Sequence, residues 1–555
     1  MKIRHILASA AFLFLATSSF AVPVKPGIWR ILRLADGTEV RAEMVGDEFC
    51  RYWRATDGSA YTHNADKDIY VPIDQNTVVA EGQQLRTKAN TMRKARASKN
   101  GTGKYTGKKR GLIILVEFTG TDDVPEKVFK TANAQAYYDR VANEKGFNDP
   151  EVGFKGSVYD YFYAQSEGQF EFNFDVAGPF RLPNTYKTYG ANDGGYETNI
   201  GKLCYDACRY ADKKGNVDFT KYDWDGDGEV DQIFILYAGQ GENVNPSDPY
   251  LIYPQEGQLG SVGTAQQPFE MDGVTIKTFA CSCELGEEER IDGIGTICHE
   301  FSHCFGLPDM YDRGSFGAST LNYGTYVWDL MNMGNYLDHG FQPAGYTAYE
   351  RAFCGWKTLK ELKESTVISD MKPLSEGGEA YIIYNDGNRD EYYILENRQK
   401  TGCDGGLYAS GMMISHVNYD SEVWAANNVN TGKECLGIFT ADNSWERTET
   451  DVMGDLYPFS GNNALTATSS PAATLVNANS DGSFLMHKDI TDITQNPDGT
   501  ISFRFTNNLA TGIRNVAEDG ATVKGKGIYN IAGQRVAGAS AAHGLYIVNG
   551  KKLIR

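Results

Sequence analysis

Two histidines near the middle of the chain have the spacing of ligands for a single metal ion. His299 and His303 lie four residues apart in a segment whose apolar residues recur at helical intervals. Because four residues of an α-helix turn through about 400°, both imidazoles project from nearly the same side. Two histidines on one helix face supply half of the coordination shell of a zinc ion. We therefore predict a zinc site on this helix.

Neighbouring residues supply the other groups that a catalytic zinc site needs. Gly306 and Pro308 stop the helix, so the chain turns back and Asp309 is a candidate third ligand. Three protein ligands leave the fourth position for water, and zinc lowers the pKa of such a water towards about 7. Glu300, beside His299, is placed to accept the water proton and pass it to a leaving amine. The pattern predicts hydrolysis of peptide bonds.

A second group of acidic residues has the spacing of a calcium-binding loop. Crowded carboxylates need a hard dication to offset their repulsion, and a glycine at the sixth position allows the sharp turn. The twelfth position holds Phe234 instead of glutamate, so this is not an EF-hand. We predict structural calcium here, and the alternative is a bare acidic turn. The predicted ligands are Asp223, Asp225, Asp227, Glu229 and Asp231.

Length and composition indicate an acidic globular protein with several domains. The chain has 555 residues, which at about 150 per domain suggests three to four units. Its net charge of −19 disfavours nucleic acid or an anionic membrane as the main partner. Hydrophobic residues make up 41% of the chain, enough for packed cores, so wholesale disorder is excluded. Strands mixed with a few helices before residue 360 predict an α+β or α/β architecture, and we expect the α+β class.

The order of patterns along the chain predicts six parts. An apolar run ending in Ser19-Phe20-Ala21 is typical of a cleavable secretory signal, so we expect a secreted or cell-surface protein without a membrane span. The stretch 85–110 is basic and has no acidic residue, which predicts an exposed, extended linker for a Lys/Arg-specific activating protease. Short alternating strands beyond about residue 360 predict a β-sandwich. The predicted parts are a signal peptide (1–21), a prosegment (22–84), the basic linker (85–110), a catalytic domain (111–358), the β-sandwich (359–510) and a small C-terminal β-module or tail (511–555).

These motifs resemble the immune inhibitor A family of secreted bacterial zinc metallopeptidases, relatives of the metzincins. The resemblance spans most of residues 22–510 and implies a metzincin-like zincin catalytic domain that acts on proteins or peptides. Residues 527–552 also resemble C-terminal tails of exported Bacteroidetes proteins, some of which direct secretion. The family resemblance is carried by the runs His299 to Asp312, Trp328 to Gly334, Ser157 to Phe162, Asp223 to Gly239 and Glu391 to Arg398.

The family resemblance also implies individual roles. His299, His303 and Asp309 would be the zinc ligands and Glu300 the general base, with Met331 in the turn beneath the metal. Metzincins usually have histidine where Asp309 stands, so Asp312 is a rival third ligand. Tyr336, five residues beyond Met331, is where some metzincins place a tyrosine that stabilises the oxyanion.

Latency and substrate binding have candidate residues as well. A prosegment before a cleavable linker predicts a latent precursor. Cys50 is a candidate for capping the zinc from the prosegment, with a disulfide or plain burial as the alternatives. The strand-like residues Val274 to Ala280 are a candidate for edge pairing with an extended substrate, and sheet interior is the alternative.

The predicted function is therefore that of a secreted zinc endopeptidase made as a latent precursor. Two other functions remain open. One is a non-enzymatic, calcium-stabilised surface adhesin on a peptidase scaffold, in which the β-sandwich and tail are the functional parts. The other is a zinc hydrolase that cleaves an amide in a non-peptide substrate.

Overall fold

The structure is a computed structural model, and the chain divides into two compact units, Met1–Asn507 and Asn508–Arg555. The predicted signal peptide and residues 91–104 of the predicted linker lie outside the described residues. No helix in the described part of the chain is long and apolar enough to cross a membrane. The described residues are 22–509, except 26, 48–49, 65–66, 91–104, 194–195, 232, 246–247, 261–265 and 314–323, together with four short strands between residues 528 and 554.

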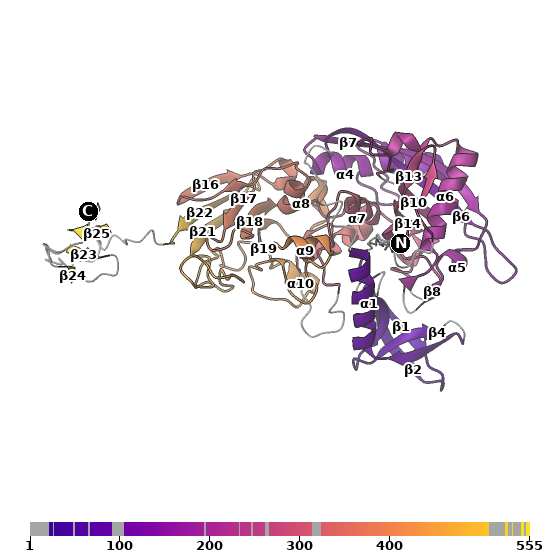
Figure 1. Ribbon diagram of the computed structural model, residues 1–555, viewed down its shortest axis with the longest axis horizontal. Helices are drawn as coiled ribbons and strands as arrows, with labels where there is room; N and C mark the ends of the chain where they lie inside the picture. The colour runs from indigo at the N-terminus through magenta and orange to yellow at the C-terminus, as the bar shows by residue number, and fades with distance from the viewer. Residues whose placement is uncertain are drawn as a thin grey trace, which may run out of the picture. The chain divides into compact units, whose positions relative to one another are not determined.

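The predicted prosegment forms a five-stranded antiparallel sheet in chain order, followed by helix α1 (Figure 1). Side chains alternate between its two faces. Cys50 and Tyr52 pack towards α1, whereas Trp53 packs in a core that includes Tyr253 of the next region. The elements are β1 (Trp29–Arg33), β2 (Glu39–Asp47), β3 (Cys50–Ala55), β4 (Ala60–Asn64), β5 (Ile69–Ile73) and α1 (Gln75–Asn90).

Both ends of the predicted linker belong to regular elements. Helix α1 continues to Asn90, and β6 begins at Gly107, so residues 85–90 and 107–110 are not the extended linker that the basic composition predicted. Arg110 in β6 lies 3.3 Å from an Asp175 carboxylate oxygen on the adjacent strand. Basic side chains near the end of the stretch are thus compatible with secondary structure, because acidic neighbours face them.

A mixed five-stranded sheet forms the centre of the first unit. Its strands follow the order β11-β14-β10-β6-β7, with the four from β14 to β7 parallel and β11 antiparallel at the edge. Residues 278–280 lie in β14 inside the sheet, where β11 covers them, which agrees with the sheet-interior alternative. The strands are β6 (Gly107–Phe118), β7 (Phe170–Leu182), β10 (Ile233–Gln240), β11 (Gln255–Gln258) and β14 (Thr278–Leu285), with β13 (Val274–Ile276) in a separate hairpin with β12 (Phe269–Met271).

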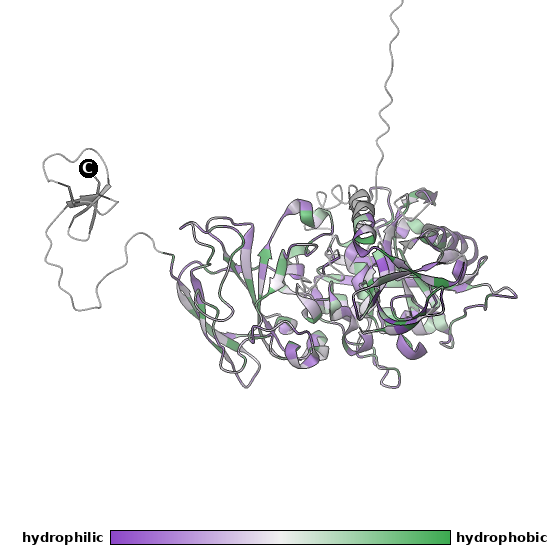
Figure 2. Cartoon of the chain, turned by 90° about the horizontal axis from the view of Figure 1, so that it is seen from below, coloured by the Kyte–Doolittle hydropathy of each residue, from purple (hydrophilic) through white to green (hydrophobic). Residues whose placement is uncertain are grey.

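Helices cover both faces of this sheet because the apolar residues of its strands alternate. Ile113 and Leu115 pack in one core with the helices α3, α4 and α7, whereas Leu112 and Ile114 pack in another with α6. Figure 2 shows hydrophobic residues on the interior strands and hydrophilic residues along the outer loops. The helices are α3 (Ala134–Asn143), α4 (Val158–Gln165), α5 (Tyr186–Tyr189), α6 (Ile200–Gly215), α7 (Gly295–Cys304) and α8 (Ala348–Phe353).

Beyond residue 358 the first unit contains two sheets that share one core. Tyr393 and Ile414 of one sheet and Ile490 and Phe503 of the other belong to the same buried cluster. The first sheet has β15 (Lys360–Glu361), β17 (Tyr381–Tyr384), β18 (Glu391–Arg398), β19 (Gly411–Asn418) and β20 (Leu436–Ile438); the second has β16 (Thr366–Met371), β22 (Ile501–Asn507) and β21 (Lys488–Gln495); α9 (Ser421–Ala425) and α10 (Glu449–Val452) lie between strands in the chain.

The second unit contains one small antiparallel sheet in the order β24-β23-β25-β26. Strands β25 and β26 pair in the antiparallel sense, with Val548 opposite Lys551. The strands are β23 (Ile528–Asn530), β24 (Arg535–Val536), β25 (Leu545–Val548) and β26 (Lys551–Ile554).

Candidate metal centre

Helix α7 carries the two histidines through the interior of the first unit, and every residue of the helix is buried. A Cβ atom on Gly295 would lie 1.9 Å from the carbonyl oxygen of Asn335, so only glycine allows the segment around Asn335 to pack against the start of the helix. Gly306 has a φ of +93°, a conformation that suits glycine and ends the helix. The sharp end returns the chain towards the two histidines.

Three ligand atoms converge on one point beside this helix. The Nε2 atoms of His299 and His303 lie 3.2 Å apart, and each lies 3.3 Å from Oδ1 of Asp309. A tetrahedral zinc ion at its usual bond length separates its ligand atoms by about 3.3 Å. These three residues form a group that could hold a metal ion, and Asp312 is not part of that group among the described residues.

The hydrogen bonds of the two rings explain why this point fits a cation. Nδ1 of His299 lies 2.8 Å from the carbonyl oxygen of Leu330, and Nδ1 of His303 lies 2.9 Å from that of Leu307. A carbonyl oxygen only accepts, so each Nδ1 must donate its proton, and the Nε2 atom of each neutral ring carries a lone pair. Two lone pairs and a carboxylate oxygen at this separation repel one another unless a cation lies between them. The donor set suits zinc.

Asp309 is held in place by a residue that the sequence patterns did not reveal. Asn427, just beyond α9, donates from Nδ2 to Oδ2 of Asp309 over 2.7 Å, and its Oδ1 accepts from the Asp309 backbone N–H over 2.6 Å. The Arg313 guanidinium lies 3.7 Å from Oδ2 of Asp309 and favours the charged form of the carboxylate. The carboxylate is therefore charged and oriented, with Oδ1 aimed at the histidines.

Met331 lies in the turn predicted for it. It is fully buried, its N–H donates to Asp329 over 2.7 Å, and its carbonyl accepts from Met310 over 2.8 Å. The carbonyl of the preceding Leu330 holds His299, as described above. The turn thus fixes one histidine ring through its backbone, while the methionine packs in the same core as α7.

The first described residues of the chain lie directly on the predicted catalytic groups. The backbone N–H of Val22 donates to Oε1 of Glu300 over 2.9 Å, and the Val22 carbonyl accepts from the Tyr253 hydroxyl over 2.8 Å. The next carbonyl, of Pro23, accepts from the Tyr336 hydroxyl over 2.8 Å. Burial raises the pKa of Tyr336 well above its ordinary value, so its hydroxyl is protonated and can donate.

Cys50 does not lie where a thiol that caps the metal would have to lie. It is buried between the prosegment sheet and α1, where its thiol faces the Val78 carbonyl at 3.5 Å. The part of the prosegment that reaches Glu300 is Val22 instead. No sequence pattern marked Val22, because its contact partner is 278 residues away.

Only some of the predicted calcium ligands lie close together. Asp223, Asp225 and Asp227 form a second group of carboxylates close enough to share an ion. Glu229 instead lies 3.7 Å from the Lys277 ammonium, and Asp231 accepts the Trp224 N–H over 2.5 Å. Three of the five predicted calcium ligands are therefore together.

Comparison with known proteins identifies the class of the domain that carries these residues. A buried helix with a histidine pair, an adjacent glutamate and a returning aspartate is the arrangement of a metallopeptidase, and residues 95–358 match the family profile "immune inhibitor A peptidase M6, catalytic domain". This match agrees with the resemblance to the immune inhibitor A family that the motifs indicated. The match ends at residue 358 and gives no support to the resemblance of the tail.

Two curated relatives agree with this assignment. The pre-pro-metalloprotease PrtV of Vibrio cholerae serotype O1 (strain M66-2) is 22% identical over 280 residues, covering 44% of this chain and 29% of the relative. Immune inhibitor A of Bacillus thuringiensis subsp. alesti is 23% identical over 302 residues, covering 49% of this chain and 43% of the relative. The chain thus spans less than half of the length of these relatives.

Proposed function

We propose that this protein is a secreted zinc endopeptidase made as a latent precursor. The observation that carries the proposal is the convergence of His299, His303 and Asp309 on one point, in a domain of a metallopeptidase family. A zinc ion held by these residues lowers the pKa of water and polarises a peptide carbonyl. Proteins or peptides are the substrates that this chemistry and this family favour.

The contacts of Glu300 and Tyr336 with the N-terminal segment support the proposed roles of these residues in peptide hydrolysis. In the latent state an oxygen of Glu300 accepts the Val22 N–H, so in the open site the same oxygen can take a proton from water and pass it to the leaving amine. Tyr336 donates to the Pro23 carbonyl, so it can equally donate to a substrate carbonyl as negative charge develops there. The N-terminal segment thus engages both groups through a backbone N–H and a carbonyl, as a substrate would.

The same contacts support latency. Removal of the predicted signal peptide after Ala21 would make Val22 the new N-terminus, with its α-amino group at Glu300. Val22, Pro23 and Val24 are buried, and Val24 donates to the Gly46 carbonyl of the prosegment sheet over 3.2 Å. A segment held in this way excludes substrate. Cutting within 85–110 by a Lys/Arg-specific protease would separate the prosegment from the peptidase domain and release the segment.

A calcium ion bound by Asp223, Asp225 and Asp227 is a further part of the proposal. The three carboxylates approach one another closely enough to share an ion, and the Gly226 and Gly228 N–H groups hold Asp223 in place. The loop precedes β10, the strand that runs to the catalytic region. The ion would fix the entry of that strand.

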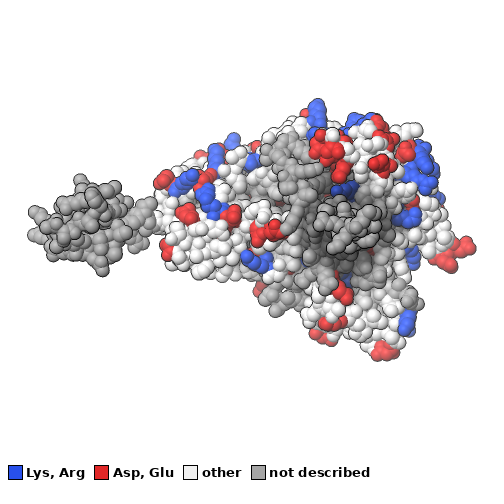
Figure 3. Space-filling view, viewed as in Figure 1, with Lys and Arg blue, Asp and Glu red and all other residues white. Residues whose placement is uncertain are grey.

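The adhesin alternative is less well supported. A binding module has no need for an acid between two metal-ligating histidines, and the set His299, Glu300 and His303 is intact. On the face in Figure 3, acidic and basic residues are interspersed, which gives no single charged surface to assign to a partner among the residues described there.

Replacing the general base tests the proposal. In the Glu300→Gln variant, activated by limited trypsin digestion, we expect an unchanged zinc content and a loss of casein cleavage of about 10²-fold to 10⁴-fold. Zinc is measured by plasma mass spectrometry. Glu287→Gln is the matched control, because this half-exposed glutamate also faces the prosegment, through Lys25, but lies outside the catalytic set. Undiminished cleavage by a zinc-loaded Glu300→Gln protein would refute the role of Glu300.

A further inference from the structure

We propose that Glu197 and Glu242 form a subsite that selects a lysine or arginine side chain of the substrate close to the cleaved bond. In the latent protein, Arg51 of the prosegment occupies this subsite. The inference rests on the proposed peptidase function and adds to it the side-chain class that the enzyme prefers.

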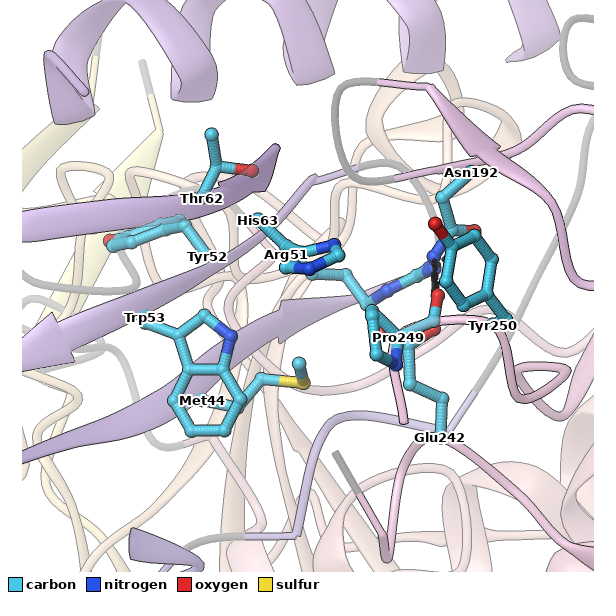
Figure 4. Close-up of a pocket in the computed structure, with 10 residues that line it drawn as sticks. All are labelled: Met44, Arg51, Tyr52, Trp53, Thr62, His63, Asn192, Glu242, Pro249 and Tyr250. Carbon is cyan, nitrogen blue, oxygen red and sulfur yellow. Dashed lines mark hydrogen bonds and ion pairs between the residues drawn. The ribbon is translucent and has the colours of Figure 1, made fainter. Parts of the chain in front are cut away.

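Arg51 points out of the prosegment sheet into the peptidase domain. It follows Cys50 on β3, and because neighbouring residues of a strand face opposite sides, it leaves the sheet on the side away from α1. Figure 4 shows it directed at Glu242 and Asn192. Its Nη2 lies 2.8 Å from Oε2 of Glu242 and 3.4 Å from Oε1 of Glu197, and it donates to Asn192 over 3.1 Å.

The two glutamates are built into the peptidase domain and are almost fully buried. The side chains of Glu197 and Glu242 are 1% and 3% exposed, and that of Arg51 is 2% exposed. Glu197 also accepts the Tyr253 N–H over 2.8 Å and the Gln255 side-chain amide over 3.0 Å. These donors are neutral, so it is the prosegment that brings a positive charge to this acidic pair.

A cation stabilises the charged form of two carboxylates that are buried together. Burial and the neighbouring Glu197 raise the pKa of Glu242 more than Arg51 lowers it, and the result is a pKa of about 7. When the prosegment leaves, the acidic pair loses Arg51 and opens to solvent. A second cation that enters with the substrate would restore the lost ion pair.

A second buried ion pair between the prosegment and the peptidase domain has the reverse polarity, because here the prosegment supplies the acid. Arg313 of the peptidase domain lies 3.0 Å from Asp47 of the prosegment, but it also lies 3.7 Å from Asp309 and donates to the Asn427 carbonyl over 3.3 Å. Arg313 therefore keeps a carboxylate when the prosegment leaves. The acidic pair instead keeps neutral donors such as the Tyr253 N–H, which makes it the better candidate for a substrate subsite.

Tyr253 links this subsite to the catalytic centre. The Arg51 guanidinium carbon lies 4.7 Å from the centroid of the Tyr253 ring, in a cation–π arrangement. The hydroxyl of the same tyrosine donates to the Val22 carbonyl, and the Val22 N–H reaches Glu300. Tyr253 also comes two residues before the edge strand β11. The side chain of Tyr253 thus lies between the acidic pair and the backbone of Val22, which contacts Glu300.

The contacts at the acidic pair need only one charged nitrogen, so a lysine ammonium can make them as well as an arginine guanidinium. The ion pairs and hydrogen bonds of the guanidinium with this pair and Asn192 use Nη2, whereas Nε and Nη1 of Arg51 have no hydrogen-bond partner among the described residues. A lysine ammonium at the Nη2 position would make the same contacts. The aromatic face of Tyr253 can cover either side chain, so both basic residues are expected ligands.

The test uses the full-length protein after activation by limited trypsin digestion and removal of the trypsin. Mass spectrometry of the casein fragments is expected to show lysine or arginine enriched at one fixed position relative to the cleaved bond. Three peptides with lysine, norleucine or glutamate at that position are then compared. We expect kcat/KM for the lysine peptide to exceed that for the norleucine peptide by about tenfold or more.

The isosteric variants Glu242→Gln and Glu197→Gln should lower that ratio towards one, through a loss of kcat/KM for the lysine peptide. Glu242→Lys should favour the glutamate peptide, because it reverses the charge of the subsite. Glu287→Gln, a glutamate that faces the prosegment outside this pocket, should leave the ratio unchanged.

The outcomes separate this inference from the proposed function. Casein cleavage by the wild type without any positional preference for a basic residue would overturn the subsite and leave the peptidase intact. The same holds if both glutamine variants keep the wild-type ratio. If the zinc-loaded wild type does not cleave casein, the peptidase proposal and the subsite fall together. The wild-type cleavage profile needs no variant, so it decides the question even if a variant fails to fold.

Discussion

The metal centre and the acidic pair that Arg51 occupies are both buried clusters of charge, but they are compensated in different ways. At the metal centre, His299, His303 and Asp309 come from one helix and the turn after it, and the peptidase domain supplies the whole ligand set. At the acidic pair, the counter-charge comes from β3 of the prosegment. In the proposed activation, the first cluster stays complete when the prosegment leaves, whereas the second loses its cation. The proposal therefore treats the first as a permanent metal site and the second as an exchangeable subsite.

Removing Arg51 should affect the latent state most strongly. In Arg51→Ala the two glutamates stay buried against the prosegment without their cation, which costs about 3 to 5 kcal/mol of prosegment docking. We expect the uncut precursor to cleave a short peptide about a hundredfold to several thousandfold faster than the uncut wild type. The zinc content should not change, because Arg51 contacts no ligand of the metal group. Activity is measured before any proteolysis, with the intact mass of the precursor confirmed.

Lys25→Ala is the matched control for that experiment. Lys25 is also a prosegment cation that pairs with a peptidase glutamate, Glu287, at 2.8 Å, but both side chains are partly exposed. Such a pair contributes at most about 1 kcal/mol, so the uncut precursor should gain only about fivefold in activity. Equal gains in activity from Arg51→Ala and Lys25→Ala would show that the buried ion pairs of Arg51 hold the prosegment no more strongly than the partly exposed pair of Lys25 and Glu287.

The two regions also differ in how far their residues could be predicted from the sequence. The histidine pair, Glu300 and the returning Asp309 follow from helix periodicity and a helix stop, because all four lie within one short run. Helix α4 was predictable in the same way from the capping box of Ser157 and Asp160, which the structure contains. Local rules of this kind are set by hydrogen bonds between near neighbours.

Contacts between distant segments escaped prediction. Asn427 is 118 residues from Asp309, and Arg51 is 146 residues from Glu197, so no spacing rule joins them. The edge strand β11 has the sequence Gln-Glu-Gly-Gln, without the alternation that marks a strand, and its presence is what turns β14 into an interior strand. Val22 was missed because it contacts Glu300, 278 residues away, through its backbone. Cys50 was suggested instead because its thiol is a possible metal ligand.

A smaller effect is expected from the residue that orients the third ligand. Asn427→Ala removes both hydrogen bonds that fix Asp309, and loss of such an outer contact typically lowers metal affinity about tenfold to a hundredfold. We expect zinc to be withdrawn by a chelator at a correspondingly lower concentration, while the saturated protein keeps most of its activity. Asn430→Ala is a fitting comparison, because Asn430 is buried nearby and donates to the Met310 carbonyl instead of Asp309. Unchanged zinc affinity in Asn427→Ala would mean that the carboxylate is positioned by other groups.

The smallest expected effect is a pH dependence of the acidic pair. The pKa of Glu242 is raised to about 7 in the folded precursor, first by burial, whereas its ordinary value is 4.5. Between these two values the folded protein holds the proton and the unfolded chain does not, so this group makes the protein less stable as the pH rises from about 4.5 to about 7. Glu242→Gln removes the titration and should show a shallower decline.

The measurement compares the thermal unfolding midpoints of both precursors, each with Glu300→Gln to prevent self-cleavage. Taking the difference cancels groups common to both proteins, such as Asp292, whose pKa burial also raises to about 7. A difference that stays constant over this range would show that Glu242 is already charged beside Arg51.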